Sequence, residues 1–377
     1  MRQAIGTPNN IKKPILAKVT KKDRNIFSRK GYVMVGNQPP RIGYSAYLTT
    51  TLSLARIPCI VDLPSDFIVD ELKESDIVLI TADGQVSVVW EDGSDQNSLL
   101  ITEACDCYCL MCPQPPKKYD ANQPILARQI LDLLDVKRVN NICLTGGEPT
   151  LLKDQFEELL FEMSKKFSDA TLSVLTNGKS FSDFEFAKRC ALATAGRILF
   201  CISLHSDNNH DHDRIVGIAG SFKKTIQGIT NLAKLGVPIE IRFVINQINV
   251  DRMSEFSDYV YRNFPFAIHV AFMAMEIRGL ADQNMAEIWI DPVEYGERVR
   301  FAATRLAMRG MVTSIYNMPL CLLPQEGWAL ARQSISGWKN DYLPQCQQCL
   351  EKDNCCGVFT SSSRQSDHIH PILAEPL

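Results

Sequence analysis

Short apolar runs alternate with helix-like stretches from Leu99 to about Gly310, and this alternation constrains the fold more than any other feature of the chain. The runs are rich in β-branched residues and suit strands buried on both faces of a parallel sheet; they are 99–101, 142–144, 172–175, 198–202, 239–245 and 268–272. Between them, apolar residues recur with helical spacing, as in 156–167. Six right-handed strand–helix units predict an incomplete (β/α)6 barrel of the α/β class, with a curved sheet open on one side.

The two ends of the chain differ from this middle part. Residues 76–90 read as two strands joined by a turn at Asp83-Gly84, which predicts a small β-rich domain over residues 1–97. We place the partial barrel at residues 98–312. Residues 313–377 then form a Cys-rich C-terminal region.

Composition narrows the class of protein. The net charge of −3 gives no reason to expect nucleic acid or an anionic membrane as partner. No apolar run is long enough for a membrane span, and the N-terminal segment lacks the apolar core of a signal peptide. The clustered cysteines among the 13 are therefore expected to serve as metal ligands in a reducing cytoplasm rather than to form disulfides.

Cys105, Cys109 and Cys112 have the spacing C-x3-C-x2-C directly after the first predicted strand. Three thiolates so close together can hold three irons of a cubane cluster and leave the fourth iron without a protein ligand. Zinc is the alternative, because Cys107 could supply a fourth thiolate, although zinc sites more often use two C-x2-C pairs.

Further candidate residues end the later strands. Chemistry in an α/β barrel sits at the C-terminal ends of its strands, so these residues should surround the same mouth as the Cys loop. For three of them a structural role is the alternative to ligand binding: Asn177 and Ser203 could stabilise turns, and Arg242 could form an ion pair inside the barrel. The candidates are Gly146, Gly147, Glu148 and Pro149 after the second strand, Asn177 after the third, Ser203 and His205 at the fourth and Arg242 within the fifth.

The C-x3-C-x2-C loop followed by the Gly-Gly-Glu-Pro turn resembles the radical S-adenosylmethionine (radical SAM) superfamily. The resemblance implies a partial barrel, a 4Fe-4S cluster on the three cysteines and SAM bound to the open iron. It also implies that the 146–149 turn offers backbone groups to the SAM ammonium and that Ser203 and His205 lie near the ribose, with Asn177 and Arg242 as further contacts. One position departs from the family: the residue before the third cysteine is often aromatic there and contacts adenine, but here it is Met111.

A second cysteine set lies near the C-terminus. Cys321, Cys346, Cys349 and Cys355 follow the spacing C-x24-C-x2-C-x5-C, which predicts four thiolates around an auxiliary iron–sulfur cluster. Zinc is the alternative metal, and Cys356 could replace Cys355. Cys107 is expected to point away from the first cluster.

A closer resemblance is carried by the runs 109–116 and 316–321, which are similar to the His-Xaa-Ser system radical SAM maturases of bacteria. It implies an enzyme that cleaves SAM to a 5′-deoxyadenosyl radical and modifies a ribosomally made peptide with His-Xaa-Ser repeats. The implied partners are a second radical SAM maturase and an external electron donor of the flavodoxin or ferredoxin type. Two alternatives remain: a non-catalytic iron–sulfur or zinc protein that acts as a redox sensor or interaction module, and a radical SAM enzyme acting on RNA.

Overall fold

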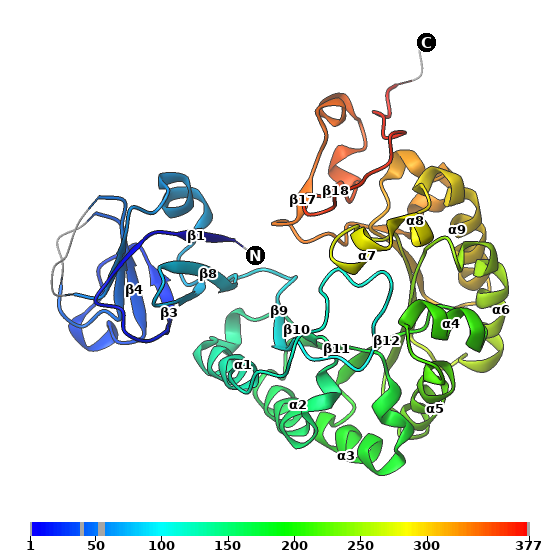
Figure 1. Cartoon of the computed structure of the whole chain (residues 1–377), viewed down its shortest axis with the longest axis horizontal. Coiled ribbons are helices and arrows are strands. Elements are labelled where there is room, and N and C mark those ends of the chain that lie inside the picture. The colour runs from blue at the N-terminus through cyan, green and yellow to red at the C-terminus, as the bar shows by residue number, and fades with distance from the viewer. Residues whose placement is uncertain (1, 38–40, 52–56, 375–377) are drawn as a thin grey trace. The chain divides into compact units, whose positions relative to one another are not determined.

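The computed structural model describes residues 2–37, 41–51 and 57–374, and the chain divides into two compact units (Figure 1). The first unit comprises residues 1–101, 121–143 and 165–171. The second comprises residues 102–120, 144–164 and 172–377, and it contains every candidate site residue.

The first unit contains an eight-stranded sheet with the order β1-β8-β7-β3-β4-β5-β6-β2. The predicted hairpin at 76–90 is confirmed as β7 and β8, which pair antiparallel. The strands are β1 (Gln3–Ile5), β2 (Thr7–Asn9), β3 (Ile15–Thr20), β4 (Tyr32–Val35), β5 (Ala46–Leu48), β6 (Cys59–Val61), β7 (Ile77–Ile80) and β8 (Gln85–Trp90).

Gly6 is the single residue between the two edge strands β1 and β2, so the chain itself joins the edges of this sheet. A side chain there would collide with its neighbours, because a Cβ on Gly6 would lie 2.4 Å from the Val61 carbonyl oxygen. The sheet therefore closes around an apolar core that includes Val19, Leu48 and Val78, and a second apolar cluster contains Met34, Tyr44, Tyr47 and Cys59.

The second sheet has the order β16-β15-β14-β13-β12-β11-β10-β9, and β11 to β16 pair in parallel. This sheet confirms the predicted partial barrel, and β15 and β16 extend it beyond the six predicted strands. The strands are β9 (Ser98–Thr102), β10 (Asn141–Gly146), β11 (Thr171–Thr176), β12 (Ile198–Ser203), β13 (Ile239–Val244), β14 (His269–Met273), β15 (Thr313–Tyr316) and β16 (Ala331–Arg332).

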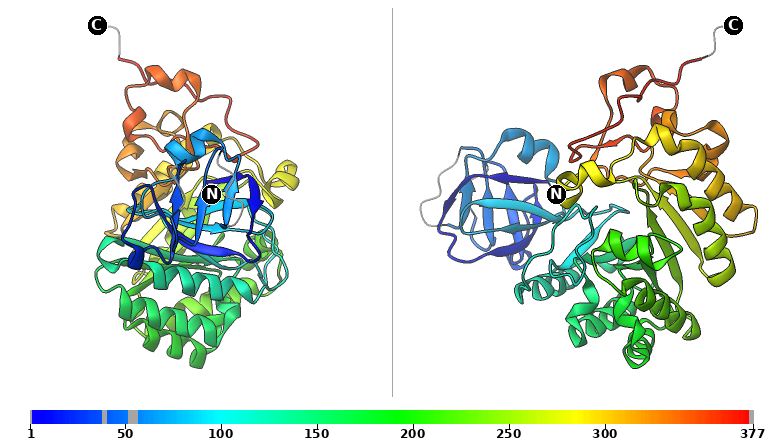
Figure 2. Two further views of the ribbon diagram at one scale, coloured as in Figure 1. Left: turned by 90° about the vertical axis from the view of Figure 1, so that its left-hand side faces the viewer. Right: turned by 45° about the vertical axis from the view of Figure 1, so that its right-hand side comes forward.

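Helices α2, α3, α5, α6 and α9 lie along the outer side of the second sheet (Figures 1 and 2). Among the described residues, we find no helix whose length and apolar character would let it span a bilayer. The helices are α1 (Asn122–Leu133), α2 (Asp154–Lys166), α3 (Phe184–Thr194), α4 (Asn209–Val216), α5 (Ser221–Lys234), α6 (Met253–Asn263), α7 (Leu280–Gln283), α8 (Met285–Ile288) and α9 (Pro292–Ala307).

Side chains alternate between the two faces of each strand. On β13, Phe243 faces the helices, where its ring centre lies 4.4 Å from that of Phe256 on α6. Arg242 therefore faces the opposite, inner side, in register with Ser203 on β12. The inner face carries the polar side chains that the sequence placed at or near the strand ends.

Gly228 lets α5 approach the turn that follows β11, because a Cβ at this position would lie 2.2 Å from the carbonyl oxygen of Gly178. We expect Gly228→Ala to lower the free energy of unfolding by about 1–3 kcal/mol, although alanine favours helix, since a backbone atom must move. Urea unfolding of the metal-free protein measures the change. Gly337→Ala is the control, because nothing lies within 4 Å of its Cβ. A Gly228→Ala protein as stable as the control would show that the contact is not a constraint.

Candidate metal centre and cofactor site

The loop that carries Cys105, Cys109 and Cys112 is held by backbone hydrogen bonds on several sides. The N–H of Tyr108 donates to Val216 O at 3.0 Å, and the N–H of Leu110 donates to Ile215 O at 2.8 Å, both at the end of α4. The Cys112 carbonyl accepts from the N–H of Leu280, the first residue of α7, at 2.9 Å. These bonds fix the loop at the C-terminal end of the sheet.

Gly146 and Gly147 lie directly against the start of this loop. A Cβ on Gly146 would be 2.4 Å from Thr102 O, and one on Gly147 would be 2.3 Å from Ala104 O. The N–H groups of Gly147 and Glu148 donate to these two carbonyls, each at 2.8 Å. The Gly-Gly pair is therefore required sterically for the Cys loop to leave the strand here.

The Glu148 side chain is buried, with 1% of its surface exposed, and links the ends of β10 and β11. It accepts from the hydroxyls of Thr150 and Thr176 and from the N–H of Asn177, each at 2.7 Å. Burial raises the pKa of this carboxyl group, and the hydrogen bonds work in the opposite direction. The Glu148 carboxylate thus holds the two strand ends together. The next residue, Pro149, begins the short 3-10 helix Pro149–Leu152.

Asn177 bonds to the Cys loop, because its Nδ2 donates to Asp106 Oδ1 at 2.8 Å. Lys179, a residue that the sequence analysis missed, places its Nζ 3.0 Å from Asp106 Oδ2. A charged residue three positions after a strand end at the barrel mouth is a signal that could have found it. The geometry of Asn177 is that of a loop-stabilising side chain.

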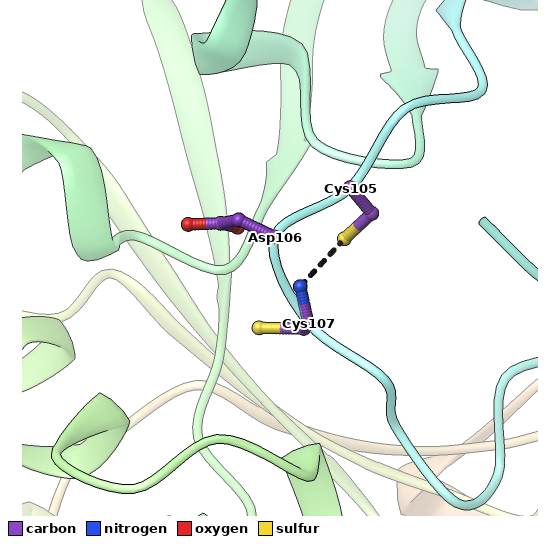
Figure 3. A group of neighbouring side chains, drawn as sticks. All are labelled: Cys105, Asp106 and Cys107. Atoms are coloured by element: carbon purple, nitrogen blue, oxygen red, sulfur yellow. Dashed lines mark hydrogen bonds between the residues drawn. The ribbon is translucent and has the colours of Figure 1, made fainter. Parts of the chain in front are cut away.

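Cys107 does not point away from the other thiols, so that expectation is wrong. Figure 3 shows its N–H donating to Cys105 Sγ, at 3.4 Å. Hydrogen bonds from the Cys105 and Cys109 thiols lower the pKa of Cys107, and the Lys179 ammonium lowers it further. The same bonds raise the pKa of Cys105 and Cys109, whereas burial raises that of Cys112. The Cys107 sulfur thus lies within 4.8 Å of the Cys105 sulfur.

The spacing of the donor atoms tests which metal group fits. Among the described residues, one set of three possible ligands lies within 4.8 Å of one another: Cys105, Asp106 and Cys107. A single zinc ion, with bonds of about 2.3 Å, needs its sulfurs about 4 Å apart. Cys105, Cys109 and Cys112 form no such compact set, and three separated thiols fit a polynuclear cluster better than one zinc ion.

Met111, which precedes the third cysteine, is buried in an apolar cluster with Ile215, Ala281 and Ile288. Asn246 Nδ2 lies 3.6 Å from its sulfur. Met111 thus anchors the loop to α4, α7 and α8 through apolar contacts.

Ser203 and Arg242 face the inside of the barrel. Ser203 is half-buried at the end of β12. The Arg242 guanidinium contacts Met273 Sδ through Nε and Nη2 at 3.3 and 3.2 Å, and its Nε lies 3.6 Å from Glu240 Oε1. The ion pair that the sequence offered as an alternative role for Arg242 is therefore present. The Met273 sulfur is only a weak acceptor for the guanidinium N–H groups.

The C-terminal cysteines Cys321, Cys346, Cys349 and Cys355 line one cavity. Backbone N–H groups of Leu320 and Gly357 point at Cys355 Sγ, each at 3.5 Å, and the N–H of Ile372 points at Cys349 Sγ at 3.4 Å. Such bonds stabilise thiolates, and a bond from the Cys356 thiol lowers the pKa of Cys355 to about 6. Cys356 does not line the cavity and is buried, with 2% of its surface exposed.

His205 is buried and joins three elements. Its Nδ1 accepts from the N–H of Val244 at 3.3 Å, and its own N–H donates to Nδ1 of His212 on α4 at 3.1 Å. The two rings stack with their centres 5.9 Å apart. Burial lowers the pKa of His205 to about 3 and that of His212 to about 4.

These two histidines predict acid sensitivity. Their folded pKa values lie below the value of about 6.5 for an exposed histidine, so the unfolded chain binds more protons in acid. Each therefore lowers the free energy of unfolding by about 1.4 kcal/mol per pH unit as the pH falls below about 6.5, until its folded pKa is reached. His212→Asn keeps an acceptor for the His205 N–H but cannot be protonated, so unfolding between pH 6 and 4.5 should depend less on pH. The control is His210→Asn, whose ring is 82% exposed on the same helix. Equal slopes for wild type and His212→Asn would contradict the assignment.

Known proteins match the central region of the chain. The Radical SAM superfamily matches residues 99–260. A protein named "Probable GTP 3',8-cyclase" from Saccharolobus solfataricus is 32% identical over 162 residues, which are 42% of this chain and 50% of that protein. An "AdoMet-dependent heme synthase" from Methanosarcina barkeri is 29% identical over 172 residues, covering 43% of this chain and 47% of that protein. The chain thus spans about half the length of the curated relatives it matches.

Among solved structures, that of Streptococcus suis SuiB bound to S-adenosylmethionine superposes with a TM-score of 0.46 and 15% identity, covering 58% of this chain and 49% of that one. The family match covers the Cys loop, the Gly-Gly-Glu turn and strands β9 to β13. Residues 99–260 are therefore similar to a radical SAM domain.

Proposed function

We propose that this protein is a radical SAM enzyme. Cys105, Cys109 and Cys112 hold a 4Fe-4S cluster, which with SAM on its open iron supplies a 5′-deoxyadenosyl radical by reductive cleavage of the SAM sulfonium. The observation that carries the proposal is the docking of the three-thiol loop on Gly146 and Gly147 at the C-terminal end of the sheet. A sensor or zinc module needs no such turn beside its thiols.

The remaining candidates have different tasks in this proposal. The backbone of the 146–149 turn contacts the SAM ammonium, while the Glu148 carboxylate keeps the turn in place. Ser203 is proposed to contact the ribose, with His205 beside it. Arg242, whose guanidinium has weak acceptors in Met273, is suited to a carboxylate of SAM or of the substrate. Asn177 acts through the Cys loop.

We also propose a second 4Fe-4S cluster on Cys321, Cys346, Cys349 and Cys355, with zinc as the alternative. The shared cavity and the N–H groups aimed at two of the sulfurs support a metal centre there. These sulfurs form no set of three within 4.8 Å, which favours a cluster over one zinc ion. Filling the site would tie together a segment that contains little regular structure.

The domain boundaries of this enzyme are part of the proposal: a β-rich domain at 1–97, the barrel at 98–312 and the Cys-rich region at 313–377. The second sheet also includes β15 and β16 beyond residue 312. The Cys-rich region therefore begins with two strands of the barrel sheet.

For the substrate we propose a ribosomally made peptide with His-Xaa-Ser repeats, modified in the cytoplasm with a second radical SAM maturase and a flavodoxin- or ferredoxin-type donor. The runs 109–116 and 316–321 support it. The relative named GTP 3',8-cyclase favours a second candidate, radical chemistry on a purine nucleotide. Anaerobic incubation with SAM, dithionite and either a His-Xaa-Ser peptide or GTP, read by mass spectrometry, distinguishes them.

Replacing Cys105, Cys109 and Cys112 together by Ala should abolish the formation of 5′-deoxyadenosine from SAM, because no thiolate remains to hold the cluster. The measurement is chromatography of anaerobic reactions with dithionite. Cys107→Ala is the matched control in the same loop and should keep both iron content and SAM cleavage. Activity in the triple variant would overturn the cluster assignment.

The second centre is tested in the background of that triple variant. We expect about four irons per chain to remain, since four thiolates fill a 4Fe-4S cluster. Adding Cys355→Ala should remove this metal, whereas adding Cys356→Ala should retain it, because only Cys355 lines the cavity. About one zinc per chain would support the alternative metal, and a metal-free triple variant would refute the site.

A further inference from the structure

We propose that the buried Lys179 and the partly exposed Asp106 form a charge pair that preorganises the Cys loop and sets the reduction potential of the cluster held there. Both are positioning residues: neither is expected to ligate iron or to contact SAM. The inference about potential rests on the proposed function. The inference about the loop rests on the chain alone.

Lys179 is the first residue of the 3-10 helix Lys179–Ser182, which follows β11, and is only 6% exposed. Its Nζ donates to the backbone carbonyl of Asp106 at 2.9 Å and lies 3.0 Å from the Asp106 carboxylate. Asp106 stands between Cys105 and Cys107 in the loop (Figure 3). One ammonium thus holds both the backbone and the side chain of the residue next to a proposed iron ligand.

Asn177 reinforces this contact from the same turn. Its Nδ2 donates to Asp106 Oδ1 at 2.8 Å, and its Oδ1 accepts from the N–H of Lys179 at 3.0 Å. The turn itself is fixed, because the N–H of Asn177 donates to Glu148 and its carbonyl accepts from Thr225 Oγ1 at 3.0 Å. The residues that bind Asp106 are therefore held in place by β10, β11 and α5 and not by the Cys loop itself.

The burial of Lys179 makes the pair more than a surface ion bridge. A buried ammonium is strongly unfavourable unless it is paired and hydrogen-bonded. Here the bonds to Asp106 raise the pKa of Lys179 against the effect of burial, so the ammonium stays charged. The Lys179 charge is therefore little screened by water, whereas the Asp106 side chain is 40% exposed and meets the solvent on one side.

The two charges act on an electron entering the cluster with opposite signs. A nearby cation favours the reduced, more negative form, and a nearby anion disfavours it. Removing Lys179 leaves the Asp106 charge unbalanced, and removing the Asp106 charge leaves the ammonium unbalanced. A purely structural pair would shift the potential in the same direction for both changes, or not at all.

The test compares Lys179→Met, Asp106→Asn and the double variant as cluster-loaded proteins, with redox titration of the EPR signal that SAM perturbs. The potential should fall in Lys179→Met, rise in Asp106→Asn and lie between them in the double variant. Arg189→Met is the control, since it removes a cation that pairs with Glu157 at the surface. Shifts of one sign, or none, would overturn the electrostatic role.

Hydrogen exchange of the metal-free proteins tests the loop independently. The amides of Tyr108 and Leu110 should exchange faster in Lys179→Met than in wild type and Arg189→Met. Unchanged exchange would overturn the preorganising role. If the wild-type loop bound no cluster, the proposed function would fail while this measurement kept its meaning. If the wild-type protein cleaved SAM but the variants had the same reduction potential and the same amide exchange rates as wild type, only the present inference would fail.

Discussion

The close passage of residues 102–104 over Gly146 and Gly147 is the contact on which the rest of the site depends. The two backbones are so near that a Cβ on either glycine would lie within 2.4 Å of a carbonyl oxygen. Two N–H groups of the turn bond those carbonyls at 2.8 Å, so sterics and hydrogen bonding fix one arrangement. The direction in which the Cys loop leaves β9 follows from this contact.

A buried polar network extends this constraint to the other strands. Glu148 bonds the end of β11, and the turn after β11 grips Asp106 through Asn177 and Lys179. Such networks are favourable only when each donor and acceptor is satisfied, and they then rigidify the groups they join. Thiols in the loop are thus positioned by side chains more than 70 residues away, as the separation of 73 between Lys179 and Asp106 illustrates.

The inner face of the barrel is polar for a related reason. Glu240 bonds His269 at 2.7 Å, and His269 bonds Ser314 at 2.9 Å, across three neighbouring strands. Burial would disfavour each group alone, but together they supply one another with partners. Arg242, next to this row of hydrogen bonds, contacts a thioether as well as Glu240. The inner face of the barrel is therefore polar, with its buried groups hydrogen-bonded to one another.

The sequence by itself determined the strand–helix alternation, strands β9 to β14 and the hairpin of β7 and β8, because local periodicity and turn chemistry specify them. It also named the four C-terminal cysteines that line one cavity. The sequence did not reveal β15 and β16, because β15 carries the polar run Thr313-Ser314 and β16 has only two residues. Tertiary structure alone decided the closure of the first sheet at Gly6, the position of Cys107 among the thiols and the pairing of Lys179 with Asp106. Those features depend on which strand ends lie side by side, and the spacing of residues along one chain does not specify the partners of a buried charge or sulfur.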